Sequence, residues 1–193
     1  MVSKSAKTLN QNQQKIFLSY LETTRNPIRN KVMFLLSHKA GLRSSEIAKI
    51  LWKMVLDSQG RIADTIHLED SICKRRSGGL LPIPKDLRKS LQDLFDLRQP
   101  SPDHNIIYSE RGRRMTAQSV TNFFWTSYAQ LGFVGSSSHS GRRYYICQIA
   151  RKVSLVGGSM VDCMRLARHS SLAMTQRYVD ANSDAAKQVV EMI

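Results

Sequence analysis

Apolar residues recur every three or four positions along most of this chain, which is the spacing of helices with one buried face. A first helix is predicted for about residues 13–23, and a second opens with Pro27 in its first turn. Gly41 ends this second helix, and Ser44 is predicted as the N-cap of a third, whose apolar stripe reaches Met54. The first part of the chain is therefore expected to be helical.

The pattern changes in the middle of the chain. Two short runs rich in β-forming residues, 61–68 and 80–84, flank the turn 77–79 and predict a small antiparallel sheet. Helical spacing returns from Leu87, with a short extended run at 106–108. The later helices are predicted over residues 116–131, 140–153, 158–167, 171–181 and 184–193. The fold class is therefore mainly α with a small antiparallel β-sheet.

The length of 193 residues corresponds to one domain or a little more. The polar residues 1–12 are predicted to form a flexible tail, and residues 13–183 to form the main domain. A polar break at 180–184 precedes the last predicted helix, 184–193, whose apolar side chains share one face. These side chains require burial, either in the chain's own core or against another molecule.

The chain is strongly basic, with a formal net charge of +14 and an isoelectric point of about 10.1. Such an excess favours a polyanionic partner, most often a nucleic acid. The charge is unevenly spread, since no Asp or Glu occurs from Arg111 to Val161. A solvated, ribosomal-protein-like surface is the alternative, but an enzyme that works on phosphates fits the pattern better.

Cysteine usage and hydropathy indicate in which cellular compartment the protein is expected to act. The cysteines Cys73, Cys147 and Cys163 form neither an even set for a disulfide framework nor a C-x-x-C pair for zinc. This usage is typical of the reducing cytoplasm, where the protein is expected to act. No apolar run is long enough to span a membrane, and the N-terminus lacks the apolar core of a signal peptide. A membrane partner is therefore not expected.

Four polar strings carry the candidate chemistry. They are the segment 41–46, the basic turn 73–79, the segment 139–143 and the segment 167–180. In this order they resemble the tyrosine recombinase (phage integrase) family, whose ordered set is Arg, Glu or Asp, Lys, His-x-x-Arg, His or Trp, and Tyr. Here that set falls on Arg43, Glu46, Lys74, His139, Arg142, His169 and Tyr178.

The resemblance implies how such a protein is built and what it does. Members of the family cut and rejoin DNA through a tyrosine that becomes attached to a 3′ phosphate. The resemblance implies the fold of their catalytic domain, double-stranded DNA as partner, and accessory DNA-bending proteins as further partners. It begins near residue 13, so a separate N-terminal core-binding domain is not expected, as in short fimbrial phase-switch recombinases. It also implies a homotetramer on DNA, in which residues 184–193 dock on the neighbouring protomer.

The residue types suit phosphodiester chemistry. An enzyme that cleaves a phosphodiester without metal must supply fixed positive charge, a nucleophile and a proton for the leaving oxygen. Arg43 and Arg142 are candidates for the charge, because a guanidinium binds two phosphate oxygens and stays charged. Arg142 and His139 also continue the apolar stripe of the predicted helix 140–153, where buried polar groups need a partner. That partner is a phosphate or, alternatively, an internal ion pair.

Tyr178 is the predicted nucleophile. A free tyrosine has a pKa of about 10, so Tyr178 needs help to lose its proton, and His139 and His169, together with the arginines, are the candidates. The resemblance assigns to Lys74 the protonation of the departing 5′ oxygen, against the alternative of a solvated basic turn. No metal and no cofactor are expected, because no carboxylate cluster with ligand spacing occurs.

The remaining charged candidates have supporting roles. Glu46 lies one helical turn from Arg43 and is expected either to orient a catalytic group or to pair with that arginine. Contacts with the DNA backbone are predicted for five further basic residues, Arg75, Arg76, Arg113, Arg114 and Arg143.

Some positions differ from the usual family pattern. Arg168 stands before His169 in place of the usual glycine, Gly141 stands where a leucine is common, and Tyr144-Tyr145 replace smaller or polar residues. None of these changes removes a reacting group. The sequence therefore predicts a site-specific recombinase for integration, excision or inversion. The alternatives are DNA relaxation of the type IB topoisomerase kind and a DNA-binding regulator without catalysis.

Overall fold

The computed structural model describes residues 6–74, 77–178 and 191, and the chain divides into two compact units, Met1–Tyr145 and Ile146–Ile193. The first unit contains α1 (Gln11–Glu22), α2 (Pro27–Lys39), α3 (Ser44–Lys49), η1 (Trp52–Met54), β1 (Thr65–Leu68), η2 (Asp70–Ile72), β2 (Gly79–Pro82), α4 (Lys85–Arg98) and α5 (Ala117–Gln130). Helix α6 (Ser140–Lys152) begins in the first unit and continues in the second, which also contains η4 (Val153–Val156), α7 (Met160–Ala167) and α8 (Leu172–Gln176). The predicted fold class, mainly α with a small antiparallel sheet, is confirmed.

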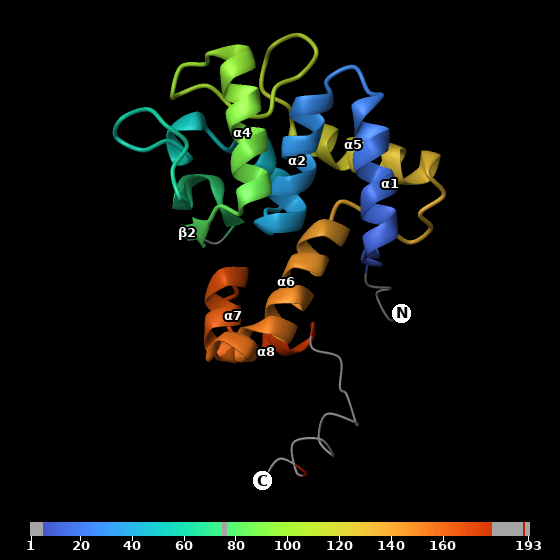
Figure 1. Cartoon of the computed structure of the whole chain (residues 1–193), viewed down its shortest axis with the longest axis vertical. Coiled ribbons are helices and arrows are strands. Elements are labelled where there is room, and N and C mark those ends of the chain that lie inside the picture. The colour runs from blue at the N-terminus through green and yellow to red at the C-terminus, as the bar shows by residue number, and fades with distance from the viewer. Residues whose placement is uncertain (1–5, 75–76, 179–190, 192–193) are drawn as a thin grey trace. The chain divides into compact units, whose positions relative to one another are not determined.

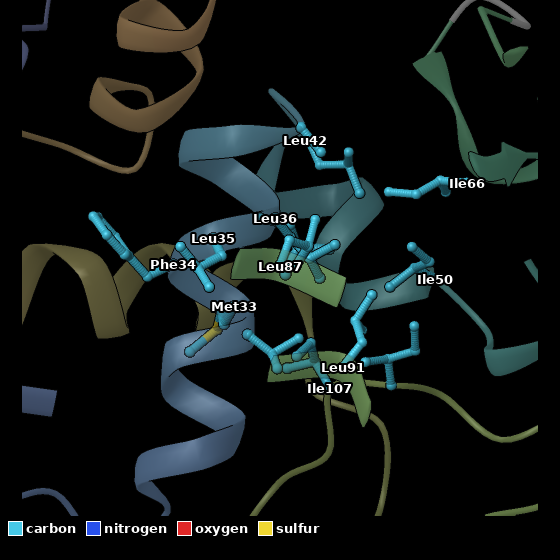
Figure 2. Packing of buried hydrophobic residues seen from close by; sticks show 14 of the residues in the cluster. Met33, Phe34, Leu35, Leu36, Leu42, Ile50, Ile66, Leu87, Leu91 and Ile107 are labelled. Carbon is cyan, nitrogen blue, oxygen red and sulfur yellow. The ribbon is translucent and has the colours of Figure 1, made fainter. Parts of the chain in front are cut away.

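Helix α2 is the centre of the first unit. It packs against α1 on one side and α4 on the other (Figure 1). Its residues 32–38 are all buried, so this helix is covered nearly all round rather than along one stripe. Figure 2 shows Met33 to Leu36 of α2 in one apolar cluster with Leu87 and Leu91 of α4. This rigid core supports the turn that follows α2.

The small sheet has the predicted form. Strands β1 and β2 pair antiparallel, with Ile66 opposite Leu81. Both side chains are buried in the core, whereas Thr65 and His67 on the alternate face of β1 are exposed. The sheet therefore fixes the two ends of the basic connection that carries Lys74.

The third helix is shorter than predicted. It ends at Lys49, and Ile50 adopts φ −58° and ψ 133°, outside the helical region. The chain turns here to form strand-like contacts, because the Ile50 carbonyl accepts a hydrogen bond of 3.1 Å from the Ile106 N–H. Ile50 and Met54 are buried in this arrangement too, so the apolar spacing alone could not show that the helix stops. The N-cap is Arg43 rather than the predicted Ser44.

Two predictions concern the ends of the chain, namely the flexible N-terminal tail and the C-terminal helix. The helix predicted from residue 13 begins at Gln11, where Asn10 and Gln13 form a capping box, and the Leu9 side chain is buried at 2% exposure. Within the described part of the expected tail, residues 6–12, the apolar Leu9 therefore packs into the core of the first unit. The predicted terminal helix, 184–193, lies outside the described residues except for position 191. Within the described part of the chain, no helix has the length and hydropathy needed to cross a membrane.

Candidate active site

Arg43 is held by Glu46 at the start of α3. The two Glu46 carboxylate oxygens accept hydrogen bonds from the Arg43 N–H and from its Nη1, each 2.8 Å long. Glu46 is fully buried, whereas the Arg43 side chain keeps 22% of its surface exposed. The pairing of Glu46 with Arg43, one of the two alternatives raised by the sequence, is therefore present. A buried carboxylate that binds both ends of the arginine restricts where the guanidinium can point.

Arg142 is attached to the same turn that carries Arg43. It lies in the first turn of α6 and is buried as predicted, at 5% exposure. Its Nη1 donates a hydrogen bond to the carbonyl of Gly41, two residues before Arg43. Gly41 has φ +64°, a left-handed conformation that favours glycine. One turn, residues 41–43, thus determines the placement of both candidate arginines.

His139 lies beside these arginines but on the surface, not on the buried stripe that the sequence predicted. The reason is that α6 begins at Ser140, so His139 precedes the helix and does not follow its periodicity. Partial burial lowers the pKa of the His139 imidazole, and the positive charges of Arg142 and Arg43 lower it further. At neutral pH this side chain is therefore uncharged and able to accept a proton.

His169 and Tyr178 form a second group, in the second unit. The two rings stack with their centroids 5.5 Å apart and an angle of 30° between their planes. The buried His169 contacts Thr175 of α8, with 3.0 Å between Nδ1 and Oγ1. Tyr178 lies just beyond α8, which ends at Gln176 instead of continuing to residue 181 as predicted. Its N–H donates to the Thr175 carbonyl at 2.9 Å, so the backbone still makes a final turn there.

The sequence model of the phage integrase family matches residues 7–184, which is most of the chain. This chain belongs to the phage integrase family. No curated protein sequence matches it.

Solved structures of tyrosine recombinases share its fold. The Tn1549 transposon integrase in complex with a circular intermediate DNA has 18% identity and a TM-score of 0.75, and the match covers 100% of this chain and 67% of that one. The XerA recombinase has 16% identity and a TM-score of 0.71, with 100% and 65% covered. A lambda integrase dimer bound to a COC′ core site has 16% identity and a TM-score of 0.64, with 94% and 62% covered. The chain thus spans about two thirds of the length of these structures and has the fold of the tyrosine recombinase catalytic domain.

The structure explains two of the positions at which this family member differs from the usual pattern. Arg168 has φ 52°, a left-handed conformation that ends α7, which is why a glycine is the usual residue there. At Gly141, a Cβ would overlap the Ser37 Oγ and lie 3.1 Å from the Ser37 carbonyl carbon. Glycine therefore allows the first turn of α6 to approach α2 closely, which a leucine at this position would prevent.

We expect Gly141→Ala to destabilise the first unit by about 1–3 kcal/mol, the usual cost of overpacking. The better helix propensity of alanine offsets only about 0.5–1 kcal/mol of this. Urea denaturation followed by tryptophan fluorescence measures the change, since Trp52 and Trp125 both belong to the first unit. Ser37→Ala is the matched control, because the buried Ser37 hydroxyl has no hydrogen-bond partner in the described region. The double variant should recover part of the loss, and a Gly141→Ala protein as stable as the parent would contradict the packing argument.

The basic connection between β1 and β2 is anchored on acidic and hydroxyl groups. The Gly78 N–H donates to Asp70 Oδ1 at 2.8 Å, and the Ser77 hydroxyl donates to the Lys74 carbonyl at 2.9 Å. The Lys74 side chain is exposed, and no described contact joins it to Arg43 or Arg142. Arg75 and Arg76, predicted to touch DNA, lie outside the described residues.

Two other predicted DNA contacts lie on a second exposed turn. Arg113 and Arg114 follow Tyr108, which pairs with Arg114 as an isolated antiparallel bridge, and the Ser109 N–H donates to the Arg113 carbonyl at 2.6 Å. Both side chains are exposed, whereas Arg143 on α6 is half-buried. Among the described residues, no group of three or more His, Cys, Asp or Glu side chains could hold a metal ion.

Several groups that contact the candidate residues were not identified from the sequence. They are Gly41, Thr175 and Cys147, whose Sγ–H donates to the Tyr178 carbonyl over 3.4 Å. The Gly41 carbonyl and the Cys147 thiol leave no signal in a single sequence, because each acts on a residue far away along the chain. Thr175 does leave one, since it occurs three residues before Tyr178 with a hydroxyl on a helix expected to be partly buried.

Proposed function

We propose that this chain is a site-specific DNA recombinase that cleaves and rejoins DNA with Tyr178 as its nucleophile. One observation carries the proposal: a single turn holds Arg43 and Arg142 together, beside His139, whose pKa their positive charges and partial burial lower. Two guanidinium groups held in fixed positions suit a phosphodiester, since each binds phosphate oxygens and neither loses its charge. Membership of the phage integrase family supports the same reaction.

The reaction conserves the phosphodiester bond energy. The Tyr178 hydroxyl gives its proton to the neutral imidazole of His139. The Tyr178 oxygen then attacks the phosphorus of the phosphate that the two arginines bind. A bond from Tyr178 to the 3′ phosphate forms, the bond to the 5′ oxygen breaks, and Lys74 supplies the proton that this oxygen gains. Attack by the 5′ hydroxyl of another strand reverses these steps and joins the new pair of ends.

The partner in this proposal is double-stranded DNA, and the Tn1549 integrase, similar in fold, was solved in complex with DNA. The formal net charge of +14 supports it, because phosphate contacts release counterions and dominate affinity. Strand exchange between two sites requires four cleavages, and a homotetramer on DNA supplies one tyrosine for each of them. Exchange of residues 184–193 between protomers, and accessory DNA-bending proteins, belong to the same proposal.

The decisive experiment identifies the DNA site and the covalent chemistry together. The purified chain is incubated in excess EDTA with fragmented DNA from the source genome, and protein–DNA adducts that resist detergent are recovered and sequenced. We expect adducts joined through a 3′ phosphate at a defined sequence, and undiminished in EDTA, because arginines rather than a metal supply the positive charge. A strict requirement for added Mg²⁺ would contradict this mechanism.

The recovered sequence also distinguishes recombination from the alternatives. A plasmid with two copies of it should yield recombinant products, and a plasmid with none should stay supercoiled. Relaxation without any copy would instead indicate topoisomerase activity. Binding without any adduct would indicate a DNA-binding regulator.

A further inference from the structure

Thr175 contacts both His169 and Tyr178. It is fully buried in α8, and its Oγ1 lies 3.0 Å from His169 Nδ1. Its carbonyl accepts the 2.9 Å hydrogen bond from the Tyr178 N–H. One residue therefore connects the backbone of the candidate nucleophile with the ring that stacks on it.

The direction of the contact between the side chains follows from hydrogen-bond accounting. A hydroxyl carries one proton, and burying it without an acceptor costs about 1–3 kcal/mol. In the described part of the chain, His169 Nδ1 is the group within hydrogen-bond distance of the Thr175 hydroxyl. The hydroxyl therefore donates, Nδ1 accepts, and an uncharged His169 carries its proton on Nε2.

We propose that Thr175 is a positioning residue that holds His169 in the Nε2–H tautomer, with its ring fixed against Tyr178. The proposal rests on the function proposed above for Tyr178. It separates the tasks of the two histidines, because an Nε2–H group donates a hydrogen bond, whereas accepting the tyrosine proton falls to His139. A partner at one ring nitrogen commonly determines what the other nitrogen does.

The rest of the environment supports a fixed ring. His169 follows Arg168, whose left-handed conformation ends α7, and the His169 N–H donates to the Met164 carbonyl at 3.0 Å. The imidazole keeps only 9% of its surface exposed. With the backbone and the ring plane held in this way, the contact with the Thr175 hydroxyl favours the Nε2–H tautomer.

The test compares Thr175→Val, which keeps the shape and removes the hydroxyl, with Thr175→Ser, which keeps the hydroxyl. Long-range ¹H–¹⁵N NMR of the histidine-labelled chain reads the tautomer without DNA. We expect the parent and T175S to show a protonated Nε2 and an unprotonated Nδ1 for His169, and T175V to show a mixture of tautomers. An unchanged tautomer in T175V would overturn the proposal.

Cleavage kinetics provide the second readout, on a nicked duplex that carries the recovered site. Thr175→Val should lower kcat for adduct formation on the order of 10–100-fold, the range seen when the partner of a metal-bound histidine is removed. Its KM and melting temperature should stay close to those of the parent, and T175S should restore the rate. If T175V does not fold, Thr175→Ala takes its place, and failure of both to fold would show a purely structural role. If the parent forms no adduct, the proposed function fails, while the NMR comparison still decides the tautomer.

Discussion

Tyr178→Phe is expected to bind DNA like the parent chain and to form no detectable covalent adduct. The substitution removes the one oxygen that would attack the phosphate, and removing a nucleophile commonly costs on the order of 10⁶-fold in kcat. The stack on His169 and the backbone hydrogen bond to Thr175 do not involve this oxygen, so the local structure should persist. Detergent-resistant complexes on a nicked substrate measure the loss, and a gel shift measures binding.

The matched control is Tyr108→Phe. Tyr108 lies in the first unit, where its ring packs under the guanidinium of Arg98, 4.0 Å from the ring centroid, and this contact does not need the hydroxyl. This variant should form adducts at the rate of the parent. Adducts that persist in Tyr178→Phe would show that the nucleophile is another residue. A Tyr178→Phe protein that no longer binds DNA would show that the hydroxyl has a structural role.

His38→Phe is expected to make the first unit more resistant to acid. His38 is 1% exposed and stacks between Phe34 and Tyr144, with ring centroids 4.8 and 4.0 Å away. Neither of its ring nitrogens has a hydrogen-bond partner in the described region. Burial and, to a smaller extent, the charge of Lys39 lower the pKa of His38 to about 3, against the opposing effect of Asp86. The folded protein therefore keeps this ring uncharged well below neutral pH.

The pH dependence follows from that difference in pKa. In the unfolded chain His38 takes up a proton near pH 6.5, whereas in the folded chain it does so only near pH 3. The free energy of unfolding therefore falls as the pH drops between these values, by up to about 1.4 kcal/mol per pH unit from this group. Phenylalanine has no proton to bind and leaves no unpaired nitrogen, so the variant should lack this loss.

Urea denaturation at pH 7, 5.5 and 4.5 tests the prediction, with tryptophan fluorescence as the signal. The carboxylates titrate equally in both proteins, so the difference between them isolates His38. We expect the stability of His38→Phe relative to the parent to rise steadily as the pH is lowered. Parallel pH curves for the two proteins would show that His38 finds a partner or water in solution.

The sequence alone predicted those helices and strands whose apolar spacing is compatible with only one type of secondary structure. The helices α1, α2, α4, α5 and α6 follow from a period near 3.6, and the sheet follows from two β-prone runs around a glycine turn. The third helix was predicted to continue too far because Ile50 and Met54 are buried even though the α-helix ends at Lys49. Periodicity shows that a side chain is buried, but not which backbone conformation buries it.

In the candidate site, too, some features could be predicted from the sequence and others could not. The order of Arg43, Arg142 and Tyr178 along the chain was enough to suggest the reaction, because it resembles the ordered set of the tyrosine recombinase family. The contacts that hold these residues could not be predicted, since Gly41 meets Arg142 across 101 positions of sequence, through a backbone carbonyl that every residue possesses. Burial of His139 was predicted wrongly, because the helix begins at Ser140 and the residue before it does not follow the helical stripe.

The attachment of Arg142 to the Gly41 carbonyl also affects how such a chain can change during evolution. The hydrogen bond from Arg142 to the Gly41 carbonyl ties its guanidinium locally to the turn that carries Arg43. Loops in the stretch from α3 to α5 can therefore lengthen, shorten or acquire new DNA contacts without moving the pair of arginines. Target-site preference can diverge in this way while the arrangement proposed to bind phosphate is inherited unchanged.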